Sequence, residues 1–226
     1  MIAPIKQLKK SEIEWLSEHR CRHSHTYLEH YNCFIEEKPE DCPFSEEVGF
    51  FDIEASNFNA DFGYLLSYAI KRKNGEIYGR ALTGKEIRNY VFDKELVQEC
   101  CKDLRRFHRI IVYYGTDYRF DIPFLRTRAI KYGHEFPLYK DIYVQDAYSL
   151  VKAKLKLHRN RLESVCIEFD IPAKEHKLIP DIWQKAMAGH DESLQYIWLH
   201  NKEDVISLEK LWIKLESYTL KSKRSI

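Results

Sequence analysis

The sequence predicts an α/β fold, a mixed β-sheet flanked by α-helices, preceded by a small extension rich in His and Cys. From residue 47 onward, short apolar runs typical of strands are followed by segments whose apolar residues recur at helical spacing. Before residue 47, His, Cys and Glu are frequent and strand character is weak. A chain of 226 residues suits one such domain with an appendage. We therefore expect an extension at 1–46, a domain at 47–218 and a basic tail at 219–226.

Five strands are expected in the domain. The second and third flank the sequence KNGE, in which Asn74 and Gly75 are typical of a tight hairpin turn. The fourth is a short apolar run that ends at Gly115, as a buried central strand would. The fifth runs directly into a helix. The predicted ranges are 47–55, 62–72, 76–82, 109–115 and the first part of 141–150.

Three long helices are expected: one between the third and fourth strands, one between the fourth and fifth, and one near the end of the chain. Asp93 stands at the position of an N-cap for the first helix. Pro123 in the first turn and Gly133 at the end delimit the second. The third carries an apolar stripe formed by Leu194, Ile197, Trp198, Val205, Leu208, Leu211, Trp212 and Leu215. The predicted ranges are 93–107, 120–133 and 191–218.

Composition argues against a membrane protein but does not identify a partner. The net charge of +1 says little about partners, because the distribution of charge matters more than its sum. The N-terminal stretch MIAPIKQLKKSEIEW lacks the apolar core of a signal peptide, and no segment approaches the roughly 20 apolar residues of a membrane span. We expect a soluble, cytoplasmic protein without membrane contact, whose six Cys are reduced thiols or metal ligands.

Asp52 and Glu54 lie within the otherwise apolar strand VGFFDIEA. Side chains two residues apart in a strand point to the same face, so the two carboxylates are expected side by side. Adjacent anions in an apolar strand repel each other and lose hydration, which costs several kcal/mol per ion unless positive charge compensates. Either a cation of the protein lies opposite them, or the pair holds metal.

Two further acids stand at notable positions. Asp121 follows the fourth strand at the start of a helix, where an N-cap is the common explanation. His200 and Asp204 are four residues apart on the last helix, which places both on one face about one turn apart. An ordinary His–Asp pair on a solvated face would also fit. Asp204 borders Val205 and Leu208 of the apolar stripe, however, so its face is at least half turned inward.

Together these motifs resemble the DEDD exonucleases, the 3′–5′ exonuclease branch of the ribonuclease-H-like fold. The matching features are Asp-x-Glu on the first strand, Phe-Asp-x-Pro-Phe-Leu at a strand-to-helix junction and His-x-x-x-Asp on a late helix. The sequence HNKEDV is similar to that of ribonuclease-H-like exonucleases related to the proofreading domains of family B DNA polymerases. The resemblance covers about residues 47–216. It implies a ribonuclease-H-like sheet and a nuclease that hydrolyses phosphodiester bonds.

The resemblance also implies two Mg²⁺ or Mn²⁺ ions held by four carboxylates, those of Asp52, Glu54, Asp121 and Asp204. Two divalent ions roughly 4 Å apart activate water and stabilise the pentacoordinate phosphate and the leaving oxygen, and Mg²⁺ prefers hard oxygen ligands. His200 would be the general base. Relatives carry Tyr four residues, or His five residues, before the last Asp. His200 stands at the Tyr-type offset, and Tyr196, one turn earlier, is the alternative base.

These expectations predict a 3′–5′ exonuclease that acts on single-stranded ends of DNA or RNA. An endonuclease on the same fold, of the ribonuclease H or Holliday-junction type, is one alternative, and a non-catalytic nucleic-acid-binding protein is another. The run VKAKLKLHRNR contains no acid and is expected to follow the phosphate backbone, although a solvated face would also explain it. Its cationic residues are Lys152, Lys154, Lys156, Arg159 and Arg161.

The extension holds a dense set of Cys and His residues, in the stretch CRHSHTYLEHYNC and shortly after it. Such a set suits Zn²⁺, which takes four N or S ligands in a tetrahedron. The spacing matches no standard zinc finger, and packing within a small helical subdomain is the alternative. The ligands we expect for a structural zinc are Cys21, His25, Cys33 and Cys42.

Overall fold

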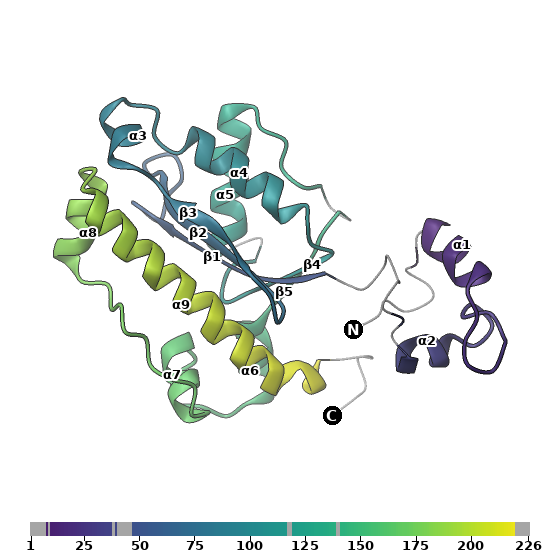
Figure 1. Cartoon of the computed structure of the whole chain (residues 1–226). Coiled ribbons are helices and arrows are strands. Elements are labelled where there is room, and N and C mark those ends of the chain that lie inside the picture. Colours follow the sequence, from purple (N-terminus) through teal and green to yellow (C-terminus); the bar gives the residue numbers. More distant parts are fainter. Residues whose placement is uncertain are drawn as a thin grey trace. The chain divides into compact units, whose positions relative to one another are not determined.

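The chain folds as two compact units, Met1–Glu47 and Val48–Ile226 (Figure 1). The structure, a computed structural model, describes residues 8, 10–37, 39, 47–116, 119–138 and 141–219. Cys42 and all of the predicted basic tail except Thr219 lie outside these residues. Within the described part of the chain, none of the helices has the length and apolar character that crossing a membrane requires.

The larger unit is built on a five-stranded mixed sheet, which confirms the predicted fold class. The strands occur in the spatial order β3-β2-β1-β4-β5. The first three form an antiparallel meander, and β4 and β5 run parallel to the central strand β1. The strands are β1 (Val48–Ala55), β2 (Leu65–Arg72), β3 (Ile77–Ala81), β4 (Arg109–Val112) and β5 (Tyr143–Asp146).

Helices cover both faces of this sheet (Figure 1). On one face, α9 (Asp191–Leu215) packs against β1 and β2, and α6 (Ala147–Lys154) packs beside it. On the other face, α4 (Lys94–Leu104) packs against β2, β3 and α5 (Asp121–Tyr132). The other helices of the described unit are α3 (Gly84–Arg88), α7 (Leu162–Glu168), α8 (Pro180–Met187) and a 3₁₀ turn at Glu216–Tyr218.

The ends of α5 and the start of α4 follow the predicted signals, but the side chain at the start of α4 has a different role. Pro123 lies in the first turn of α5, and Gly133 ends it in the left-handed region with φ 68°. Asp93 occupies the N-cap position of α4, but its side chain makes no capping hydrogen bond. It accepts a hydrogen bond from the Leu65 amide at 2.7 Å and pairs with Arg128 at 2.5 Å. Asp93 is thus the N-cap residue that the sequence predicts, but its carboxylate joins β2 to α5 instead of capping the helix.

The smaller unit consists of two short helices, α1 (Lys10–Glu18) and α2 (Tyr31–Glu37), joined by a loop. A single bridge between Arg20 and Thr26 closes this loop. The buried residues of the unit form one small cluster, made of Leu16, Cys21, Tyr27, Cys33 and Phe34.

Candidate active site

The central strand β1 presents two different faces. Phe51 and Ile53 are buried in the larger core, which includes residues of α4 and α5. Phe50 points to the opposite face and packs with residues of α9. Asp52 and Glu54 continue that second face and are half-buried. The two carboxylates therefore share a face, as the strand period predicts, and the element opposite them is α9.

Asp121 is directed at β1 from the start of α5. The residue is only 3% exposed, and its Oδ1 accepts a hydrogen bond from the Ile53 amide at 3.1 Å. Gly115 makes room for it, because a Cβ at that position would lie 2.1 Å from Asp121 Oδ2. The N-cap position of α5 belongs to Phe120 rather than to Asp121. Asp121 is thus held beside Asp52 and Glu54 instead of capping its own helix.

His200 of α9 faces the acids with one ring nitrogen. Its Nε2 lies 3.0 Å from Asp204 Oδ2 and 3.6 Å from Glu54 Oε1. Its Nδ1 donates a hydrogen bond to the carbonyl oxygen of His176 at 2.5 Å. Because a carbonyl oxygen can only accept, this contact places a proton on Nδ1 and leaves Nε2 toward the carboxylates.

Two further polar residues belong to the site and are not among those that the sequence predicts. Asn201 is fully buried, and its Nδ2 donates a hydrogen bond to Asp52 Oδ2 at 2.5 Å. Lys174, in the segment between α7 and α8, forms an ion pair with Asp204. Asn201 directly follows His200 in the motif HNKEDV, which could have drawn attention to it. Lys174 carries no such local signal, because an irregular segment brings it to α9.

The carboxylates of the site raise one another's pKa. Burial, followed by the charges of Asp204, Asp121 and Glu54, raises the pKa of Asp52 well above its usual range. Burial also raises the pKa of Glu54 to about 8 and the pKa of Asp121 to about 7. Burial acts in the same direction on Asp204, but the hydrogen bond from His200 and a neighbouring ammonium lower its pKa overall. The charges of Lys174 and His200 also act on Glu54, but Asp204 is the one carboxylate of the four whose pKa is lowered overall.

The same surroundings also change the pKa of His200. Burial alone would lower its pKa, but the hydrogen bond to Asp204 and the charges of Asp204 and Glu54 raise it overall. Ligand atoms of Glu54, His200 and Asp204 lie within 4.8 Å of one another. Tyr196, the alternative base, donates its hydroxyl to the Lys177 carbonyl at 3.2 Å. It is therefore His200, and not Tyr196, that faces the acids.

The donors present fit divalent cations. Carboxylate oxygens of Glu54 and Asp204 lie within 4.8 Å of each other, and Asp121 is near enough for its charge to raise the pKa of Asp52. Carboxylate oxygens are the ligands that Mg²⁺ and Mn²⁺ prefer. Added positive charge would also relieve the repulsion that raises the pKa values of Asp52 and Glu54. The Nε2 of His200 could act either as a further ligand or as a base.

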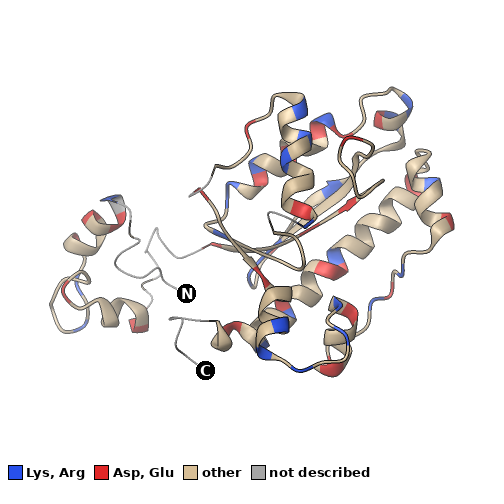
Figure 2. Cartoon of the chain, turned by 180° about the vertical axis from the view of Figure 1, so that it is seen from behind, with Lys and Arg blue, Asp and Glu red and all other residues tan. Residues whose placement is uncertain are grey.

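The basic run predicted to follow phosphates begins at the end of α6 and leads to α7 (Figure 2). Four of its five cations are exposed, and Lys154 is half-buried. Among the residues that the structure describes, none forms an ion pair with these side chains. The exposed members are Lys152, Lys156, Arg159 and Arg161.

The predicted zinc ligands are brought together only in part. Cys21 and Cys33 lie in one group with His23 and His30, and His25 is outside this group. Cys42, the fourth expected ligand, lies outside the described residues.

Residues 49–216 match the RNase H superfamily, and the chain therefore belongs to this superfamily. The match confirms the resemblance that the three motifs predict. Among curated protein sequences, none matches this chain significantly. Membership of the superfamily supports a nuclease that acts on nucleic acid.

A solved structure of a family B DNA polymerase from the hyperthermophilic archaeon Pyrobaculum calidifontis is similar to this chain. The TM-score is 0.57 at 20% sequence identity, and the match covers 80% of this chain and 26% of the polymerase chain. The chain thus spans about a quarter of the length of that polymerase. At this identity the likeness shows a shared fold.

Proposed function

We propose that the protein is a metal-dependent 3′–5′ exonuclease of the DEDD type. The observation that carries this proposal is the convergence of four largely buried carboxylates, three of which have raised pKa values. Buried charges that only support a fold are normally paired. Two divalent ions held here would, when bound, stabilise negative charge on the phosphate and on the leaving oxygen. The residues that would hold them are Asp52, Glu54, Asp121 and Asp204.

His200 is the general base in this proposal. The His176 carbonyl holds Nδ1–H, so the ring cannot turn away from the acids without losing that hydrogen bond. Nε2 is then the atom that takes a proton from the attacking water. The carboxylates favour the cationic ring, whereas bound cations favour the neutral ring that a base requires. Filling the site with metal would therefore switch His200 into its active protonation state.

A groove beside the acids offers a place for the bases of a single strand. It has a volume of about 250 Å³, and its lining includes Phe58, Arg119 and Phe120. Phe58 is 86% exposed, and its ring meets that of Phe120 at a centroid distance of 5.6 Å. Bases stack on aromatic side chains with little dependence on sequence. Phe58 follows Glu54 after a short loop and Phe120 directly precedes Asp121, so the groove adjoins the proposed site.

The basic run at 151–161 supports the same class of substrate. Its exposed cations have no ion-pair partner among the described residues, so they remain able to contact phosphates. Contacts of this kind hold a nucleic acid without reading its sequence. The run is therefore proposed to hold the strand while the acids act on its end.

The experiment that tests the proposal uses single- and double-stranded DNA and RNA, each labelled at either end, with Mg²⁺, Mn²⁺ or a chelator. A 3′–5′ exonuclease shortens a 5′-labelled strand through a ladder and releases a labelled mononucleotide at once from a 3′-labelled strand. It leaves circular single-stranded DNA intact. Cleavage of the circle would identify an endonuclease, and binding without products in any metal would identify a non-catalytic protein. The matched control is the Asp52→Asn variant, which should give no products.

A further inference from the structure

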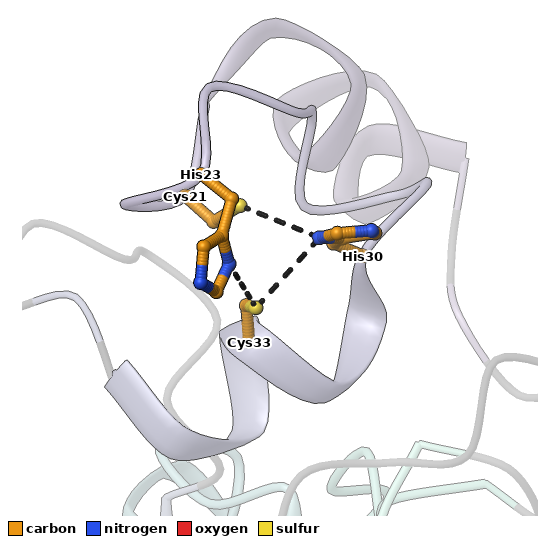
Figure 3. A group of neighbouring side chains, drawn as sticks. All are labelled: Cys21, His23, His30 and Cys33. Atoms are coloured by element: carbon orange, nitrogen blue, oxygen red, sulfur yellow. Dashed lines mark hydrogen bonds between the residues drawn. The ribbon is translucent and has the colours of Figure 1, made fainter.

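Four Cys and His side chains converge in the smaller unit, in the loop between α1 and α2 and at the start of α2 (Figure 3). They are Cys21, His23, His30 and Cys33, and one ligand atom of each lies within 4.8 Å of all the others. His30 Nδ1 lies 3.9 Å from the Sγ atoms of both Cys21 and Cys33. His23 Nδ1 lies 3.3 Å from Cys33 Sγ.

These separations are close to the edges of a zinc tetrahedron. Bonds of about 2.3 Å to sulfur and about 2.0–2.1 Å to nitrogen place neighbouring ligand atoms about 3.3–3.8 Å apart. A single Cys–His hydrogen bond would bring two such atoms together. It would not bring two sulfur and two nitrogen atoms to mutual contact around one point. The arrangement therefore resembles a coordination sphere more than a chance packing of polar side chains.

Local backbone structure builds the cluster from both sides. The Ser24 amide donates to the Cys21 carbonyl at 2.8 Å, and Ser24 has a left-handed φ of 66°, so the chain turns tightly around His23. The Cys21 amide in turn donates to the His25 carbonyl at 2.9 Å. His30 directly precedes α2 and Cys33 lies in its first turn, and the Cys33 amide donates to the His30 carbonyl at 2.9 Å, so the two residues are one turn apart.

The described part of the unit has a small core. Among its described residues, the buried cluster has five members, two of which are Cys21 and Cys33. Both of these are free thiols. Folded units below about 70 residues commonly depend on a disulfide, a metal or a partner, because their cores bury little apolar surface.

We propose that the smaller unit binds one structural Zn²⁺ through Sγ of Cys21 and Cys33 and Nδ1 of His23 and His30. Four protein ligands close the coordination sphere, as in structural rather than catalytic zinc sites. Two thiolates also balance the charge of the ion. The set keeps Cys21 and Cys33 of the four ligands expected from the sequence, and it has His23 and His30 in place of His25 and Cys42.

The test measures zinc in the full chain, purified under reducing conditions without added metal, by elemental analysis and native mass spectrometry. We expect about one zinc per chain. Replacement by Co²⁺ should give the absorption of thiolate-to-cobalt charge transfer, which the acids of the larger unit cannot produce. His30→Asn and Cys33→Ser should each reduce the bound zinc at least tenfold. A chelator should open residues 10–37 to protease.

Matched variants separate the proposed ligands from their neighbours. His25→Asn changes a His of the same loop, and Cys42→Ser changes the other expected ligand, and both should keep full zinc content. Cys21→His keeps a zinc ligand at its position, so it should retain zinc with an altered cobalt spectrum even if Cys21→Ser fails to fold.

Three outcomes would overturn the proposal. The first is a well-folded wild-type protein without zinc. The second is a disulfide between Cys21 and Cys33, seen as a mass lower by two hydrogens in the proteolytic fragments that contain both residues. The third is loss of zinc in His25→Asn with full retention in His30→Asn. None of these readouts depends on nuclease activity.

Discussion

Two buried carboxylate sites in the larger unit differ in how their charge is balanced. Asp93 has no exposed surface, and it is surrounded by donors. It accepts hydrogen bonds from two nitrogens of Arg128, from the Tyr132 hydroxyl and from the Leu65 amide. One buried anion thus meets one buried cation with bidentate geometry, and the pair joins α4, α5 and β2.

The candidate active site has four carboxylates and far fewer donors. Lys174 and His200 both contact Asp204, and His200 also lies 3.6 Å from Glu54, so two cations face four acids. Asp52 receives a hydrogen bond from the neutral amide of Asn201. A compensated acid such as Asp93 serves the fold, whereas uncompensated acids lower its stability and need an added cation. This difference separates a carboxylate that supports the fold from the carboxylates that are proposed to hold metal.

The largest expected effect tests the uncompensated acids directly. Asp52→Asn or Asp121→Asn should reduce cleavage to background, because each removes a proposed metal ligand. Each variant keeps an oxygen that can accept the present hydrogen bond, so the fold should persist. The metal-free variants should resist urea better than wild type, because a repulsion is removed. Titration calorimetry should show weaker Mn²⁺ binding, and full wild-type activity in excess chelator would refute the metal site.

The next largest effect concerns His200. His200→Ala should lower the cleavage rate about 10²–10⁴-fold with little change in Mn²⁺ affinity, the usual range for a positioned base. Wild-type activity should fall on the acid side with one ionisation, since protonated Nε2 cannot accept a proton.

Two variants sharpen this test. His200→Tyr should recover part of the activity and move the pH profile upward, because relatives use Tyr at this offset. A marked loss of Mn²⁺ affinity in His200→Ala would instead make His200 a ligand. Near-normal activity of His200→Ala, together with an inactive Tyr196→Phe, would assign the base to Tyr196.

The matched change at the compensated site should affect stability rather than chemistry. Asp93→Asn leaves the buried guanidinium of Arg128 without its counter-charge, which should cost about 3–5 kcal/mol of unfolding free energy. Cleavage per folded molecule should stay at the wild-type level. The double variant Asp93→Asn with Arg128→Met should recover part of the stability. If Asp93→Asn were as stable as wild type, the contrast between the two sites would not hold.

The two sites should also differ in their dependence on pH. In the folded protein the pKa of Glu54 is raised from 4.5 to about 8 and that of Asp121 from 3.8 to about 7, so between these values the folded state holds more protons than the unfolded state. The stability of the metal-free protein should therefore fall as pH rises from about 5 to 8, by up to about 1.4 kcal/mol per pH unit for each proton.

The lowered pKa of Asp204 acts in the opposite sense, and its contribution is lost only as the pH falls below its usual range. Urea unfolding at a series of pH values provides the measurement. Saturating Mn²⁺ should abolish the decline, and Asp52→Asn should reduce it. A metal-free protein that grows more stable between pH 5 and 8 would contradict the assignment.

The smallest effect concerns the basic run. Replacing Lys152, Lys154 and Lys156 by Ala should weaken binding equally for all sequences and lower the salt dependence by about one unit of slope for each phosphate that is no longer bound. The control is Arg105→Ala with Arg106→Ala, because these side chains are already paired with Glu135 and Asp103. An unchanged salt slope in the triple variant would show that the run is a solvated face.

Local periodicity explains which parts of the site the sequence predicts. Asp52 and Glu54 share a face because strand side chains alternate, and His200 faces Asp204 because a helix brings residues four apart together. Asp121 follows a predicted strand and begins a predicted helix, which places it at the end of that strand. These are short-range relations, and the succession of strands and helices along the chain follows from similar local signals.

Long-range and irregular features could not be predicted in the same way. Lys174 reaches Asp204 through a segment without regular structure, and the partner of Asp93 lies on another helix. Among His23, His25 and His30, the choice depends on the turn at Ser24, whose left-handed φ is not typical of serine. Side-chain direction in such loops depends on backbone angles that composition does not determine.

The order of the elements along the chain has a consequence for biosynthesis. Asn201 contacts Asp52 across 149 positions, and α9 follows every strand of the sheet. A chain that leaves the ribosome N-terminus first can form the hairpin of β1 and β2 early, but it cannot place His200 or Asp204 until α9 has been translated. For the proposed nuclease, the nascent chain would therefore stay inactive beside its own messenger RNA, because docking of α9 against the sheet is the step that completes the catalytic residues.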